Sequence, residues 1–357
     1  MSESTLFSIA VICFLFSFLG HVISAAAGRN SFKIGSRIAT LLGVICSSAG
    51  LILRWRASGH PPLSNMYESL VTLATFTVWV SLLFSFRSEK EFRSDSPLGF
   101  FEGAINVFAV LTFGVASLFP NEIRPLVPAL QSYWLHIHVA LAFIGEACFA
   151  ASFILSYLLI FRNFLLNRKN PKFPYSLSEK VISFLIVYGI PTGLFALLLM
   201  IFSKMLQNST LSYASVYLLV FGLFPVGTVC IMLFLSLYVL RGAVGEYIER
   251  LAPSEERMDE LIYRAIAIGF PLFTVGALVF GMVWANKAWG RYWGWDPKET
   301  WALITFLTYS IYLHLRLTRG WSGNWMAILS VLGFLVTLFT LFGVNLYLSG
   351  LHSYAGN

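Results

Sequence analysis

The stretch Leu135–Phe161, "LHIHVALAFIGEACFAASFILSYLLIF", is the clearest guide to the fold of this chain. Glu146 is its only charged residue, and the run is longer than the roughly 20 apolar residues that an α-helix needs to cross a bilayer. The whole chain shares this character, with 57% hydrophobic and 11% charged residues and a mean hydropathy of +0.76. Because such a composition leaves too little polar surface to face water, the sequence predicts an integral membrane protein.

Other apolar runs of similar length lie on both sides of this stretch. Ten runs in all are long enough to span a bilayer: 6–24, 36–53, 66–86, 100–118, 135–161, 181–203, 213–240, 263–284, 300–315 and 325–347. The sequence therefore predicts an all-α fold, a polytopic membrane helix bundle of about ten transmembrane helices. The connections between the runs are short, so we expect residues 1–357 to form a single membrane domain.

Lysine and arginine are distributed unevenly between the connecting loops. If ten helices alternate in direction, one set of loops holds 17 of the 24 basic residues. Cytoplasmic loops of membrane proteins are enriched in basic residues, so we expect this set to be cytoplasmic and both termini to lie on the outer side. The net charge of +7 then reflects topology, and no nucleic-acid partner is expected.

A tryptophan-rich segment, "AWGRYWGWDPKETWALITF", runs from Ala288 to Phe306. In its middle, Asp296 is a candidate N-cap, Pro297 suits a first helical position, and Glu299 completes the pattern of a helix start. The aromatic residues before this start are either a belt at the membrane interface or the wall of a site for a flat, largely apolar ligand. In the second case Arg291 or Lys298 could meet carboxylates of that ligand.

The segment "WGRYWGWDPKETWALITF" closely resembles the WWD signature of the haem-handling proteins of cytochrome c maturation. Three further stretches are similar to the CcsA (ResC) branch of system II and occur in the same order: "PPLSNMYESL" at 61–70, "SYWLHIHVAL" at 132–141 and "GVNLYLSGLHSY" at 343–354. The resemblance covers about residues 60–357 with a gap, because we expect the chain to hold more helix around residues 162–250 than many relatives do, and that segment has no assigned role. It implies that residues 284–300 form an outer, tryptophan-rich haem-binding loop.

This resemblance implies a cytochrome c biogenesis protein that carries haem b across the membrane as its substrate. At the outer side the haem would be presented for covalent attachment to apocytochrome c, and no residue of the chain is expected to be catalytic. The resemblance further implies a CcsB (ResB)-type partner subunit in a holocytochrome c synthase complex, which leaves open whether this chain is itself an enzyme. The membrane would be a bacterial cytoplasmic membrane or a thylakoid membrane, with the loop on the periplasmic or lumenal side.

The resemblance also assigns ligands of the haem iron among the six histidines. His138 and His352 match two outer ligands that flank the loop, and His314 matches a membrane ligand whose counterpart comes from the partner subunit. The loop residues expected to bind haem are Trp289, Arg291, Trp293, Trp295 and Asp296. The residues alone leave alternatives open: His136 could replace His138, His314 could be an interfacial side chain that reaches the cytoplasm, and His21 is a reserve candidate.

Three acidic residues lie in or beside apolar runs, where an isolated charge is costly. For Glu68, Glu102 and Glu146 we favour a structural role over a functional one, and for Glu68 that role is a helix cap after Ser64. Two other classes of function are alternatives to haem handling. A b-type cytochrome that transfers electrons would need paired histidines along its helices, and a secondary transporter with an aromatic outer gate would show inverted repeats. The sequence shows neither pattern.

The topology predicts the behaviour of a reporter fused after Asn357. Alkaline phosphatase is expected to be active there, because the basic loops place the C-terminus on the outer side. A fluorescent reporter that folds only in the cytoplasm should stay dark at the same position, and its fluorescence would contradict the topology.

Overall fold

The computed structural model describes residues 2–27, 30–91, 98–123, 125–126, 128–166, 177–191 and 253–348. The chain divides into two compact units, which are residues 1–156 with 253–357 (unit 1) and residues 157–252 (unit 2). Every regular element in the described ranges is helical, which confirms the all-α class. That residues 1–357 form a single membrane domain stays a prediction.

Two helices of unit 1 are interrupted by π-helical segments. Its elements are α1 (Glu3–Ala27), α2 (Asn30–Ser58), α3 (Met66–Glu91), α4 (Gly99–Ala116), the 3₁₀ turn η1 (Pro128–Leu130), the first part of α5 (Tyr133–Leu166), α11 (Glu255–Phe273), the π-helical segment η4 (Thr274–Phe280), α12 (Gly281–Trp289), α13 (Pro297–Arg319), α14 (Asn324–Leu338), the π-helical segment η5 (Phe339–Gly343) and α15 (Val344–Tyr347). Unit 2 contains the end of α5, α6 (Leu177–Phe184) and the π-helical segment η2 (Leu185–Gly189).

Seven helical segments among the described residues are long and apolar enough to cross a membrane. They are Glu3–Ser24, Ser31–Ser58, Met66–Arg87, Gly99–Ala116, Tyr133–Leu166, Glu255–Trp289 and Asn324–Gly343, and each coincides with a predicted run. The run 300–315 lies within α13, which carries charged residues at both ends and is not one of the seven. The run 181–203 is described only to residue 191, and 213–240 lies outside the described residues. A membrane helix bundle is therefore confirmed, whereas the count of ten stays a prediction.

The helix predicted at 263–284 extends beyond its apolar run at both ends. It begins at Glu255, because the side chain of Ser254 accepts a hydrogen bond from the Arg257 amide at 3.3 Å and caps the helix. Through η4 and α12 it continues to Trp289, where Gly290 adopts a left-handed conformation with φ of +72°. A serine cap and a left-handed glycine, which hydropathy does not register, thus set the two ends of this helix.

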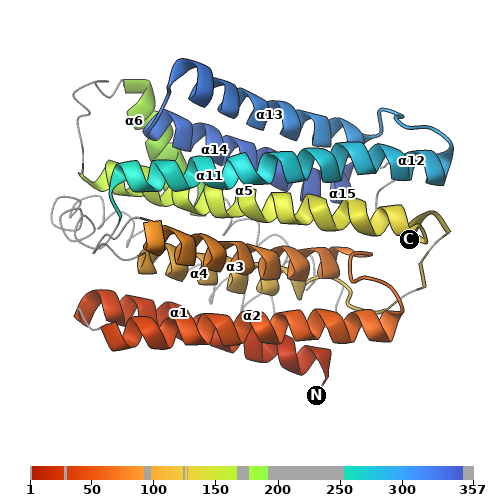
Figure 1. The fold of residues 1–357 in the computed structure, drawn as a ribbon, viewed down its shortest axis with the longest axis horizontal. Coiled ribbons are helices and arrows are strands. Elements are labelled where there is room, and N and C mark those ends of the chain that lie inside the picture. Colours follow the sequence, from red (N-terminus) through yellow and green to blue (C-terminus); the bar gives the residue numbers. More distant parts are fainter. Residues whose placement is uncertain are drawn as a thin grey trace, which may run out of the picture. The chain divides into compact units, whose positions relative to one another are not determined.

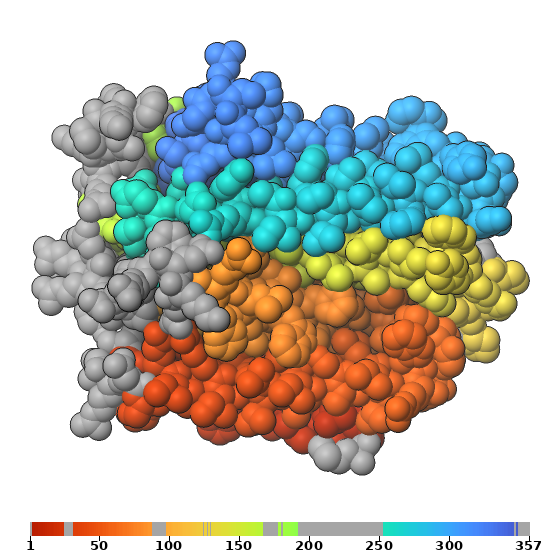
Figure 2. Space-filling view, viewed as in Figure 1, coloured from red at the N-terminus to blue at the C-terminus, as the bar shows by residue number. Residues whose placement is uncertain are grey.

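The helices of unit 1 run roughly parallel to one another (Figure 1). α1 packs against α2 and α4, α3 packs against α4, and α13 packs against α11 and α14. In the space-filling view, α11 and α12 lie directly along the first part of α5 (Figure 2). We call the end of unit 1 that carries the connection between α12 and α13 the loop end, and the opposite end the far end. The start of α1 also lies at the loop end (Figure 1).

A buried arginine joins several helices at the loop end. The side chain of Arg54 is 1% exposed, and its guanidinium lies 2.7 Å from a carboxylate oxygen of Glu68 and 2.6 Å from one of Glu3. It also donates to the carbonyl of Asn121 at 2.8 Å. The second oxygen of Glu68 accepts from the Ser64 amide at 2.7 Å, at the start of α3. The structural role that we favoured for Glu68 is thus confirmed.

A second polar cluster lies at the far end, between α1, α2 and α4. Arg37 pairs with Glu102 at 2.6 Å, and Nε2 of His21 lies 3.5 Å from the same carboxylate. One turn along α4, Asn106 donates to the hydroxyl of Thr40 at 3.1 Å. Such pairing satisfies polar groups where lipid offers no partner. Glu102 therefore has the structural role we favoured, and His21 belongs to its cluster.

Candidate functional site

The candidate site depends on a close contact between the backbones of α5 and the α11–η4 segment. A Cβ atom on Gly145 would lie 2.7 Å from the amide nitrogen of Phe273, and one on Gly276 would lie 2.6 Å from that of Ala142. No real side chain fits at such distances, so these positions need glycine. Small residues allow membrane helices to approach in this way.

This contact brings a carbonyl of η4 to the side chain of His138 on α5. Nδ1 of His138 lies 2.9 Å from the carbonyl oxygen of Gly276, and the imidazole stacks on Trp284 with 5.8 Å between ring centroids and 12° between planes. A carbonyl can only accept, so Nδ1 carries the proton and donates it to this bond. The neutral imidazole then keeps its lone pair on Nε2. Histidines that bind metals commonly have this arrangement.

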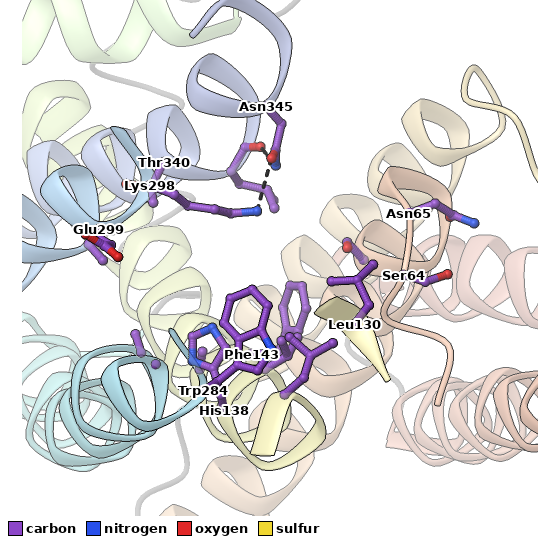
Figure 3. A pocket seen from close by; sticks show the side chains of 18 of the residues that line it. Ser64, Asn65, Leu130, His138, Phe143, Trp284, Lys298, Glu299, Thr340 and Asn345 are labelled. Carbon is purple, nitrogen blue, oxygen red and sulfur yellow. Dashed lines mark hydrogen bonds between the residues drawn. The ribbon is translucent and has the colours of Figure 1, made fainter. Parts of the chain in front are cut away.

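His138 lies on the wall of a cavity of about 490 Å³ in unit 1. This volume is within the range of roughly 300–1,000 Å³ found for small-molecule sites. Figure 3 shows His138, Trp284 and Phe143 on one side, Lys298 with Asn345 on another, and Ser64, Asn65 and Leu130 on a third. Further lining residues are Glu122 and Leu126 before α5, Glu146 on α5, Met282 on α12, Trp289, Tyr292 and Trp293 around the loop, and Thr340 on η5.

The connection between α12 and α13 is short and held by backbone hydrogen bonds. Asp296 caps α13, and the side chain of Glu299 accepts from the amides of Gly294 at 2.7 Å and Asp296 at 3.2 Å. The predicted helix start, with Pro297 in the first turn, is confirmed. Because α12 continues to Trp289 and α13 begins at Pro297, much of the expected loop 284–300 is helical.

The aromatic residues around this connection divide into two groups. Trp284, Trp289 and Trp293 line the cavity, and the first two meet edge to face with their ring centroids 4.8 Å apart. Trp295 is 70% exposed, has a φ of +55° that is uncommon for a bulky residue, and does not line the cavity. The aromatic wall of the cavity thus includes Trp289, Tyr292 and Trp293 of the segment and Trp284 before it, but not Trp295.

Several residues assigned by the resemblance do not line the cavity. Arg291 is exposed, and its guanidinium lies against Gly294, where a Cβ would be 2.6 Å from Arg291 Cζ. Asp296 is buried as the cap of α13, and His314 is exposed toward the far end of that helix. His136 is also not among the lining residues, and His352 lies outside the described residues.

Several polar residues of the cavity were not in the expected set of haem-binding residues, among them Lys298, Glu146 and Asn345. Lys298 donates from Nζ to Oδ1 of Asn345 at 3.0 Å (Figure 3). Glu146, for which we favoured a structural role, lines the same cavity. A signal for Asn345 was present in the sequence, because an amide side chain interrupts the apolar run 325–347.

Comparison with known proteins identifies the family. The family described as "Cytochrome C assembly protein" matches residues 63–352, which is most of the chain. The chain belongs to the cytochrome c assembly protein family.

Within this family, CcsA proteins are similar over nearly the whole chain. "Cytochrome c biogenesis protein CcsA" of Prochlorococcus marinus (strain NATL1A) is 36% identical over 358 residues, covering 97% of this chain and 93% of the relative. CcsA of Pinus thunbergii is 35% identical over 344 residues, covering 94% and 90%, and CcsA of Synechococcus elongatus is 35% identical over 321 residues, covering 87% and 84%. The similarity therefore extends into the first 60 residues, where the motifs gave no signal. This family membership places the chain in cytochrome c biogenesis.

The glycine contact predicts the effect of Gly276→Ala. The new methyl group would meet the Ala142 backbone, so we expect a loss of about 1–3 kcal/mol of stability and a clearly lower Tm of the purified protein. Gly114→Ala is the matched control, because a Cβ there meets nothing within 4 Å, and its Tm should be unchanged or slightly higher. Equal Tm values for the two variants would contradict the contact.

Proposed function

We propose that this chain carries haem across the membrane and presents it in the cavity at the loop end for covalent attachment to apocytochrome c. The observation that carries the proposal is His138, whose Nδ1 is held by the Gly276 carbonyl on the wall of a 490 Å³ cavity. Membership of the cytochrome c assembly family supports the same function. The haem is the substrate, and haem b is the form we propose.

His138 is proposed as one axial ligand of the haem iron. Its Nδ1 bond fixes the tautomer and the ring orientation, which leaves Nε2 as the donor to iron. We propose His352 as the second outer ligand, on the resemblance to the family alone. The indoles of Trp284, Trp289 and Trp293 provide flat apolar surface for the macrocycle. We propose that Asp296 contributes indirectly, by capping α13 and so ordering the loop. Arg291 and Trp295 stay proposed haem contacts, although neither lines the cavity.

A second haem position is proposed near the far end, at His314. This residue lies sixteen positions after Lys298, which places it roughly 24 Å further along α13. One haem cannot contact both positions, so transport would need two stations. The side chain of His314 is exposed, as a ligand must be if its counterpart comes from a CcsB (ResB)-type subunit. We propose that subunit as the partner.

The chemistry asks little of the protein itself. Each thiol of the apocytochrome adds across one vinyl group of haem, with sulfur bonding one carbon and the proton going to the other. The protein orients the macrocycle, keeps the iron ligated and excludes other reactions.

We further propose ten membrane helices with the loop end on the periplasmic or lumenal side, in a bacterial cytoplasmic or thylakoid membrane. Electron transfer by a b-type haem and secondary transport are less well supported, because the family acts in cytochrome c assembly.

The first prediction of the proposal concerns His138. His138→Gly should lower the haem bound by the protein purified with its partner, and added imidazole should restore part of it by filling the vacant ligand position. His136→Gly is the matched control on the same turn of α5 and should keep its haem, because His136 does not line the cavity. The opposite result for the two variants would make His136 the ligand.

The second prediction concerns the direction of transport. If haem enters at the far end, His314→Ala should reduce haem at both stations, whereas His138→Ala should leave the far station occupied. Haem per protein is measured by the pyridine haemochrome assay in each variant purified with its partner. Full haem content and normal cytochrome c assembly in His314→Ala would show that His314 is an interfacial side chain and that haem takes another route.

A further inference from the structure

Lys298 brings a positive charge to a cavity that is otherwise largely aromatic and aliphatic. It lies in the first turn of α13, where the helix dipole also favours an anion. Charged side chains at membrane depth are costly and usually serve a function. Among the described lining residues, Lys298 is the only lysine or arginine that a negative group of a ligand could meet.

A neutral amide is one of the partners that orient Lys298. Its Nζ donates to Oδ1 of Asn345 at 3.0 Å, and Nδ2 of Asn345 donates to the carbonyl of Leu341 at 2.5 Å. Asn345 is 3% exposed, so this amide cannot easily turn away. An amide positions the ammonium without cancelling its charge, whereas a carboxylate at position 345 would do so.

Three acidic residues line the cavity, Glu122, Glu146 and Glu299, and Asp296, the cap of α13, also interacts electrostatically with Lys298. Glu299 is turned into the cap of α13, where its side chain accepts hydrogen bonds from two backbone amides. Glu146 lines the cavity from α5 and interacts electrostatically with Lys298. An entering carboxylate would therefore compete with Glu146 for the ammonium.

We propose that Lys298, positioned by Asn345, forms a carboxylate subsite that binds the propionates of haem. The inference rests on the proposed function and assigns the subsite to Lys298 rather than to Arg291, which is exposed and packs on Gly294. Propionates and vinyl groups lie on opposite edges of the macrocycle. With the propionates at Lys298, the vinyl edge faces away from α13, which leaves it open to the thiols of an apocytochrome.

The test compares two ligands that differ only in the carboxylates. Ferric protoporphyrin IX and its dimethyl ester are titrated into the protein purified with its partner subunit, and the Soret absorbance and tryptophan quenching give Kd. Wild type should bind the free acid about tenfold or more tightly than the ester, as expected for a charge-assisted hydrogen bond. Lys298→Met should abolish this preference by weakening the acid and leaving the ester unchanged.

Lys287→Met is the matched control. Lys287 lies on α12 near the loop and is exposed, but it does not line the cavity. This variant removes the same charge from the same end of unit 1 and should keep the preference for the acid. Its loss in Lys287→Met would assign the effect to net charge and overturn the subsite.

Two further variants decide the matter if Lys298→Met does not fold. Lys298→Arg should keep the preference for the acid, and Asn345→Asp should reduce it, because the new carboxylate would pair with Lys298. If Lys298→Met binds both ligands more weakly by the same factor, or if Asn345→Asp keeps an unchanged preference for the acid, the subsite is overturned. The proposed haem-handling function would still stand. If wild type binds neither ligand, the proposed function fails and the subsite fails with it.

Discussion

The site depends on the contact of two helix backbones, those of α5 and the α11–η4 segment. Gly145 and Gly276 allow an approach that any side chain would prevent. The same approach places the Gly276 carbonyl 2.9 Å from Nδ1 of His138. Gly276 lies in the π-helical segment η4, which begins three residues after Pro271. A proline and a π-helical segment both disturb the regular hydrogen bonding of a helix. A backbone irregularity inside a membrane helix thus orients the imidazole of the site.

The bilayer explains why the other polar side chains occur in clusters. Lipid offers no hydrogen bonds, so polar groups at membrane depth must pair within the protein. Arg54 with Glu3 and Glu68 does so at the loop end, and Arg37 with Glu102 does so at the far end. These clusters hold the first four helices together. Around the cavity, Lys298, which donates to Asn345, and Glu146 line a common space.

Local chemistry made part of this structure predictable from the sequence. Seven apolar runs became membrane-length helices, and Asp296, Pro297 and Glu299 form the predicted helix start. Other features depend on contacts between distant segments. His138 lines the cavity and His136 does not, and Lys298 lines it whereas Arg291 packs against Gly294. Hydropathy also missed the full length of the helix from Glu255 to Trp289, because caps rather than apolar residues end it.

The most direct measurement is a structure by electron cryo-microscopy of the haem-loaded protein with its partner subunit. The account predicts a macrocycle in the cavity, with its iron coordinated by Nε2 of His138 and its plane against the indoles of Trp284, Trp289 and Trp293. Iron bound to His136, or a macrocycle outside this cavity at the loop end, would contradict it.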